Sequence, residues 1–256
     1  RHDHDHTVHA TAALSFHGTP STRSDPGEKG PGFEVSGVHP ERMGIKSFQP
    51  DEGKWKTLRK HGFTVAHLAP SDGILRGTGP CVLLGQGNPN LLTLKEEVAQ
   101  IMAFDPVGKK QSPPVYPNSL MGTLAVIRQA FHDVTHARET SLYLKENPSS
   151  QPHLPHAGIR SLQKVIDKKE PFPVWVEPGS CLMENRALIL SKELGFHPVI
   201  IATGDEWRRP DLALSKDHSY VSPLLFPALS KFPEDEDWEQ VSLDQLRAWD
   251  HAPGNP

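Results

Sequence analysis

The fold is decided by the stretch Phe172-Pro-Val-Trp-Val-Glu-Pro-Gly-Ser180 and by the later stretch Phe196-His-Pro-Val-Ile-Ile-Ala-Thr-Gly204. Each contains a short apolar run that is typical of a buried strand. Residues 181–194, which lie between them, have the apolar spacing of a helix, with Ser180 as N-cap and Gly195 just past the end. A strand, a helix of about four turns and a second strand predict a parallel crossover.

The alternation of strands and helices extends in both directions from this unit. The predicted strands are 63–68, 172–177, 197–202 and 219–225, and the predicted helices are 52–61, 119–145, 157–168, 181–194, 205–214 and 243–249. We also expect two short paired β segments at 74–75 and 81–84, whereas 91–104 fits a strand or a helix equally well. This alternation is typical of the α/β class with a parallel sheet.

Polar residues follow two of the predicted strands, at the places where parallel sheets bind their ligands. Glu177 follows one strand directly and is a candidate for metal binding or proton transfer. Thr203 follows the next strand and is a candidate substrate contact. Asp205 and Glu206 come next, and helix capping and the helix dipole explain them without a ligand.

Further candidates lie upstream. His67 stands near the end of its predicted strand and could face a barrel interior as a metal ligand, although a lone strand histidine is more often a core residue. Asp72 and Arg76 lie in the loop that follows, where they could contact a substrate or form a surface ion pair. His132 and His136 have a metal-capable spacing of four, but we expect them on the solvent side of their helix.

Residues 1–32 differ in composition from the rest and are predicted to form a flexible arm, because they are rich in Ser, Thr, Pro, Gly and charge. The arm begins with four histidines in nine residues, His2, His4, His6 and His9. Such a tract can bind zinc, nickel or copper weakly, and a simply solvated arm is the alternative. Residues 33–256 are expected to form the folded part.

Composition excludes some classes of function. A formal net charge of -4 provides no basic surface for nucleic acid, and no apolar run approaches the roughly 20 residues of a membrane span. The 25 prolines predict extended loops. The chain begins with Arg1, which we interpret as the start of a processed or excised segment. The cysteines, Cys81 and Cys181, could form a disulfide or remain as two buried thiols.

Three segments together resemble the amidohydrolase superfamily, and most closely its bacterial, imidazolonepropionase-like members. They are Phe63-Thr-Val-Ala-His-Leu-Ala-Pro-Ser-Asp-Gly-Ile-Leu-Arg-Gly77, Tyr116-Pro-Asn-Ser-Leu-Met-Gly-Thr-Leu-Ala-Val-Ile-Arg-Gln129 and residues 238–256, which begin Trp-Glu-Gln-Val-Ser-Leu. The resemblance implies a metal-dependent (β/α)8 barrel, that is, a TIM barrel, that hydrolyses the C–N bonds of amides, cyclic imides or dipeptides with zinc-activated water. It also favours the periplasm or the cell exterior.

This sequence departs from the pattern that the resemblance implies. Glu177 stands where the family has a histidine after the fifth strand, and Thr203 stands where it has one after the sixth. The His-x-His of the first strand and the aspartate of the eighth are not found. We therefore expect a partial barrel with an incomplete or degenerate metal site, completed by the rest of a parent chain or by a homo-oligomer.

Three functions remain open at this point. The first is hydrolysis of a non-peptide C–N bond in a small-molecule substrate by the full-length parent, with zinc or another divalent metal and with Glu177 as one ligand. The second is a non-catalytic barrel that binds a ligand or partner. The third is metal storage by the histidine arm, which predicts that deletion of residues 1–10 abolishes metal uptake and leaves the fold intact.

Overall fold

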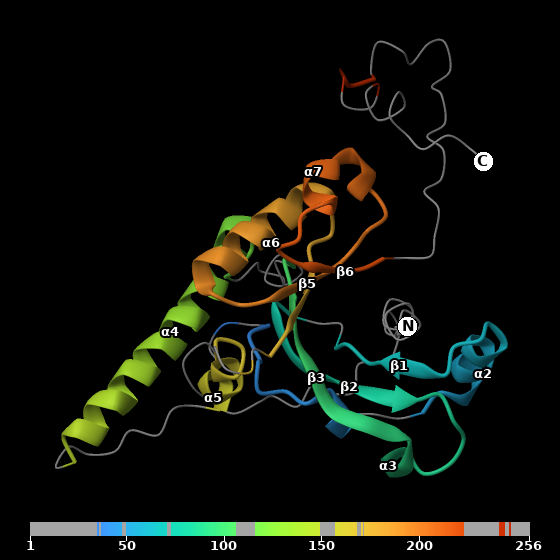
Figure 1. The fold of residues 1–256 in the computed structure, drawn as a ribbon, viewed down its shortest axis with the longest axis horizontal. Helices are drawn as coiled ribbons and strands as arrows, with labels where there is room; N and C mark the ends of the chain where they lie inside the picture. The colour runs from blue at the N-terminus through green and yellow to red at the C-terminus, as the bar shows by residue number, and fades with distance from the viewer. Residues whose placement is uncertain are drawn as a thin grey trace.

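The computed structural model describes residues 35, 37–47, 50–70, 73–105, 116–148, 157–167, 170, 172–222, 241–243 and 246. Six strands form one sheet in the order β1-β2-β3-β4-β5-β6 (Figure 1). Their bounds are β1 Val65–His67, β2 Leu75–Leu83, β3 Thr93–Ala103, β4 Val174–Glu177, β5 Pro198–Ile201 and β6 Ser219–Val221. β3 to β6 are mutually parallel, whereas β2 runs antiparallel to both of its neighbours.

The antiparallel part of the sheet follows from the lengths of its connections. Only residues 68–74 join β1 to β2, which is too short for the crossover that a parallel pair needs. The β2–β3 connection contains only the short helix α3, Pro89–Leu92. β2 is a single nine-residue strand, so the prediction of two short segments at 74–75 and 81–84 is wrong.

The ambiguous segment 91–104 is mainly the strand β3. Its second half, Ala99–Ala103, is buried at every position, so it lacks the alternation that marks a half-exposed strand. The structure explains this pattern: one face of β3 packs against helices, and the other contributes to a second apolar cluster.

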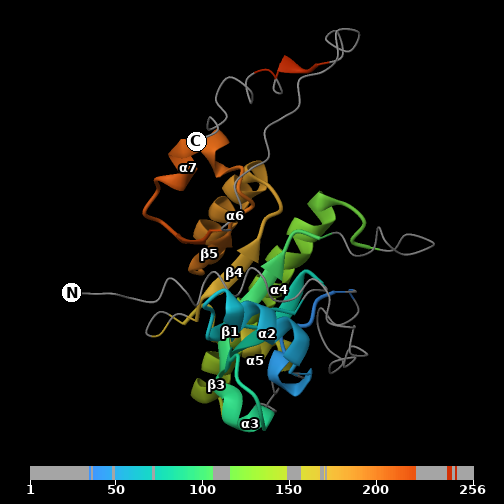
Figure 2. The ribbon, with the colours of Figure 1, turned by 90° about the vertical axis from the view of Figure 1, so that its right-hand side faces the viewer.

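The helices extend the alternation that the sequence predicts. Their bounds are η1 Gly44–Ser47, α2 Glu52–Lys60, α4 Leu120–Glu146, α5 Ala157–Gln163, α6 Cys181–Leu194, η3 Glu206–Arg208 and α7 Pro210–Ala213. α4, α5 and α6 lie on the same side of the sheet (Figures 1 and 2). None of the helices in the described ranges combines the length and the hydrophobicity of a membrane span.

One predicted helix is broken. In place of a helix over 205–214, the chain forms η3 and the single turn of α7. Pro210 causes the break, because its ring restricts the residue before it, and Arg209 has the non-helical angles φ -138° and ψ 66°. The predicted arm 1–32 and most of the predicted helix 243–249 lie outside the described residues.

The predicted parallel crossover is confirmed. β4 and β5 pair in parallel, and α6 joins them with the bounds that the sequence indicates. The Ser180 hydroxyl accepts a hydrogen bond from the backbone N–H of Met183, at 3.3 Å, and Gly195 ends the helix with φ 75°. A left-handed residue at this place favours glycine.

We expect Ser180→Ala to lower the free energy of unfolding by about 1 kcal/mol, because one N–H of the first turn of α6 loses its acceptor. Urea denaturation measures the change. Ser180→Asp is the matched control, because its carboxylate can accept the same hydrogen bond. An equal loss in both variants would contradict a capping role.

The core is divided between the two faces of the sheet. Alternate residues of β4 show the division, since Val174 and Val176 pack with the helices and Trp175 packs on the opposite face. The cluster on that opposite face consists of Ala99, Ile101, Trp175, Val199 and Val221. A further cluster around Trp55 attaches α2 to β1 and β2. The face that carries Trp175 also carries Glu177, two residues further along the strand.

Candidate functional site

The candidate site lies at the edge where the parallel strands end. Because β3 and β4 run in the same direction, Ala103 and Glu177 end their strands side by side. β2 is antiparallel to β3, so its beginning lies at the same edge, with Leu75 opposite Met102. Arg76, the second residue of β2, therefore comes near the end of β4 although 101 residues separate it from Glu177.

Arg76 and Glu177 form a largely buried ion pair. Arg76 Nη1 donates a hydrogen bond to Glu177 Oε2 at 2.7 Å, and the two side chains are 6% and 27% exposed. Arg76 also donates from Nε to the Gly73 carbonyl, at 3.0 Å, and from Nη1 to the Pro70 carbonyl, at 3.4 Å. The guanidinium thus ties the β1–β2 connection to the end of β4.

His67 lies in the core behind this pair. It is fully buried, and its ring centroid is 4.2 Å from that of Trp175, with the planes tilted by 53°. On another side the imidazole lies against Gly79, where an added Cβ would come within 2.6 Å of Nε2. The structure thus places His67 as a core residue, one of the two interpretations that the sequence allows.

Thr203 lies just past the end of β5, in a turn closed by its own neighbours. The Glu206 carboxylate accepts hydrogen bonds from the backbone N–H of Thr203 and of Gly204, at 2.6 and 2.9 Å. The Thr203 hydroxyl lies within hydrogen-bonding distance of the Asp205 and Glu206 carboxylates. Its polar groups therefore stabilise this turn, and among the described residues no hydrogen bond or ion pair joins Thr203 to Arg76 or Glu177.

The structure brings together part of the predicted site. Arg76 and Glu177 are in direct contact, and His67 is linked to them through Trp175, which precedes Glu177 by two residues on the same face. Asp72 lies outside the described residues. Sequence reasoning missed Trp175 as the contact of His67, although its place two residues before Glu177 was a readable signal.

The described residues do not fit the divalent metal that the resemblance implies. They contain no group of three or more His, Cys, Asp or Glu side chains that could hold a metal ion. Glu177 Oε2 is occupied by a guanidinium, whose positive charge opposes a second cation beside it. His132 and His136 are exposed on α4, as expected, and join no such group within the described part.

The strand order and the helix-covered face define a mixed α/β architecture, consistent with part of a (β/α)8 barrel. It is similar to a solved structure, an amidohydrolase from Thermotoga maritima MSB8, with a TM-score of 0.64 and 16% sequence identity. The match covers 84% of this chain and 55% of that one, so this chain spans about half its length. At this identity the likeness shows the fold. No family model and no curated protein matches the sequence.

Proposed function

We propose that this chain is part of an amidohydrolase-like barrel that binds a small polar ligand at its strand-end edge without metal-dependent hydrolysis. The observation that carries this proposal is the Arg76–Glu177 ion pair. A carboxylate held by a guanidinium is fixed in position and already neutralised, which suits hydrogen bonding to a ligand better than metal binding.

The second carboxylate oxygen of Glu177, Oε1, indicates the chemical class of the ligand. Oε2 accepts the hydrogen bond from Arg76, which is the one partner of the carboxylate among the described residues. The side chain remains 27% exposed, so Oε1 is left as an acceptor at the edge of the sheet. An acceptor in this position favours ligands with N–H groups, such as amides and ureides.

A second candidate is hydrolysis of a C–N bond by a longer protein to which this chain belongs. The fold likeness to an amidohydrolase favours it, as does the match to only 55% of that chain. In that case, residues beyond the described part would supply the metal ligands. Glu177 could join them only after giving up its contact with Arg76.

Metal content and ligand binding test both candidates. In a chain that lacks residues 1–10 of the histidine arm, incubated with zinc chloride and dialysed, we expect less than about 0.1 zinc per chain by elemental analysis, since zinc sites need three or four ligands and the described residues contain no such group. Hydantoin, a cyclic ureide with two N–H groups, serves as the probe. We expect calorimetric titration to show that hydantoin is bound and chromatography to show that it is not hydrolysed.

Glu177→Gln is the matched variant for this test. It keeps the size of the side chain and replaces an acceptor oxygen by an amide nitrogen, so we expect it to weaken hydantoin binding about tenfold. Glu193→Gln, an exposed position on α6, should leave binding unchanged. Zinc close to one per chain, together with hydantoin hydrolysis, would refute the proposal and support the hydrolase instead.

A further inference from the structure

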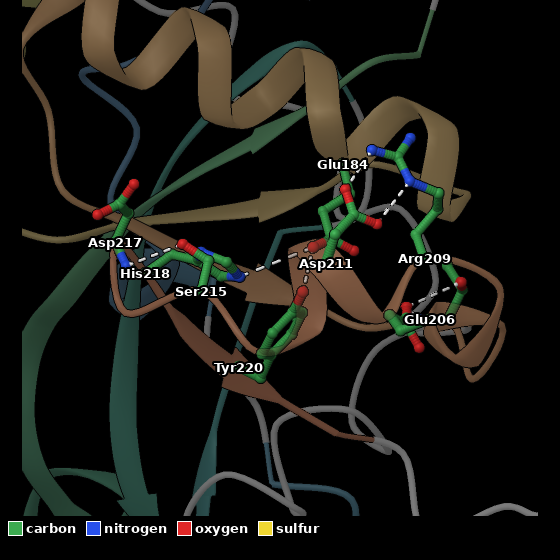
Figure 3. A network of polar contacts seen from close by, with 9 residues as sticks. Glu184, Glu206, Arg209, Asp211, Ser215, Asp217, His218 and Tyr220 are labelled. Carbon is green, nitrogen blue, oxygen red and sulfur yellow. Dashed lines mark hydrogen bonds and ion pairs between the residues drawn. The ribbon is translucent and has the colours of Figure 1, made fainter.

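A buried cluster of polar side chains lies on the helix-covered face of the sheet, on the side opposite Glu177. It consists of Glu184 from the first turn of α6, Tyr220 from β6 and His218 from the residues just before β6 (Figure 3). The Tyr220 hydroxyl donates a hydrogen bond to Glu184 Oε1. His218 Nε2 lies 3.7 Å from the same oxygen, and the His218 ring stands edge-on to the Tyr220 ring at 4.6 Å.

Because this cluster is buried, its charge state affects the stability of the fold. The side chains of Glu184 and His218 are 1% and 0% exposed. Within the described part of the chain, Glu184 Oε2 and both ring nitrogens of His218 have no hydrogen-bond partner. An isolated carboxylate or imidazolium would be costly here, whereas the pair is neutral overall when it holds one proton between its two members.

We propose that Glu184, His218 and Tyr220 form a one-proton clamp that holds β6 against α6 and loosens when the proton is lost or a second one is bound. The proposal does not depend on the function proposed for the strand-end edge. It follows from three side chains that join the short strand β6 to a helix. β6 has three residues and pairs with β5, and the exposed Lys192–Asp217 ion pair is a second described link between α6 and the residues before β6.

The surroundings of the cluster determine the direction of the effect. Three other charged groups act on Glu184, and all come from the connection between β5 and α7: Asp205, Glu206 and Arg209. Three other titratable groups act on His218: Lys192 from α6, His197 from just before β5 and Asp217 from just before β6. Burial raises the pKa of Glu184 above its ordinary value, and the two nearby carboxylates raise this pKa further. Burial lowers the pKa of His218.

These directions define a pH window. Because the folded pKa of Glu184 is raised, its contribution to stability is complete below the ordinary value of 4.5 and is lost as pH rises through the folded pKa. Because the folded pKa of His218 is lowered, its contribution is complete above 6.5 and is lost as pH falls. The one-proton state therefore has an alkaline limit set by Glu184 and an acid limit set by His218, and the clamp holds best in the window between these two limits. Burial also raises the pKa of Tyr220, so its hydroxyl stays protonated throughout.

Amide hydrogen exchange of the full chain, measured by NMR from pH 4 to 9, tests the clamp. The Ala202 N–H donates to the Val221 carbonyl and reports the attachment of β6, whereas the Val174 N–H donates to the His197 carbonyl and reports the centre of the sheet. We expect the protection factor of Ala202 to fall outside the window by up to about tenfold per pH unit, as one-proton linkage requires. The protection factor of the Val174 amide should fall less.

Two variants and their matched controls complete the test. Glu184→Gln should flatten the alkaline side of the Ala202 profile, and His218→Gln should flatten the acid side. Their controls are Glu193→Gln and His136→Gln, at exposed positions away from the cluster, which should keep the wild-type profile over the whole pH range. A wild-type Ala202 profile in Glu184→Gln would overturn the clamp, as would equal changes at Ala202 and Val174.

One measurement does not depend on any variant. With carbon-13 in the glutamate carboxyl groups, the Glu184 signal of the wild-type chain should titrate with a midpoint above 4.5. A midpoint at or below 4.5, together with a His218 ring whose carbon-13 signals show it to be neutral at the same pH, would leave the pair without its proton, and the one-proton clamp would then be wrong.

Discussion

Replacing Arg76 by methionine is expected to lower the free energy of unfolding by about 3 kcal/mol, because a largely buried ion pair loses one partner. Methionine keeps much of the volume of the side chain but leaves the Glu177 carboxylate without its donor. The Gly73 and Pro70 carbonyls also lose the hydrogen bonds that close the β1–β2 connection. Urea denaturation, followed by circular dichroism, measures the loss.

Two controls separate this effect from a general loss of charge. Arg128→Met removes the donor of an exposed ion pair with Glu193, whose side chains are 40% and 38% exposed, and should cost far less. The double variant Arg76→Met with Glu177→Met should recover a large part of the lost stability, because no buried charge remains unpaired. If Arg76→Met and Arg128→Met were equally stable, the strand-end ion pair would not be a structural anchor.

Local signals made the centre of the fold predictable from the sequence. The bounds of α6 follow from a capping serine and a C-terminal glycine, and both interactions involve residues within a few positions of each other. The same holds for α4, which the sequence predicts over 119–145 and which the structure gives as Leu120–Glu146, with Ser119 as its N-cap. Where a boundary depends on neighbouring residues, the sequence carries the information.

β2 shows where local signals mislead. Gly77, Gly79 and Pro80 suggest a turn, yet the strand continues through all three. The two glycines are required by close packing: a Cβ on Gly77 would lie 2.2 Å from the Arg42 carbonyl oxygen, and one on Gly79 would lie 2.3 Å from that of Leu68. Arg42 is distant from Gly77 in the sequence, and Leu68 reaches Gly79 only because the chain folds back between them. The sequence pattern alone therefore cannot show why these two positions need glycine.

The candidate site was only partly predictable for a related reason. The sequence places Glu177 and Arg76 next to strand ends but cannot show that they meet, because their contact depends on β2 running antiparallel to β3. Glu184 was missed altogether. A glutamate on a helix normally faces water, and nothing near it in the sequence indicates that a tyrosine 36 residues later would bury it.

Trp175→Ala is expected to have the largest effect of all, a loss of about 3–5 kcal/mol in the free energy of unfolding. Trp175 is almost fully buried, packs with Val199 and Val221 across the strands and covers the ring of His67. Its removal leaves a cavity that rigid strands on either side cannot close. Thermal and urea denaturation should both register the loss.

Trp175→Phe is the matched variant, since it keeps an aromatic ring against His67 and should retain most of the stability. The histidine ring-proton signals in the NMR spectrum provide a local readout. We expect the His67 signal to shift strongly in Trp175→Ala, because the indole that faces its ring is gone, and to shift less in Trp175→Phe. An unchanged His67 signal in Trp175→Ala would show that the two rings are not packed together, and the face of the sheet behind Glu177 would then have a different core.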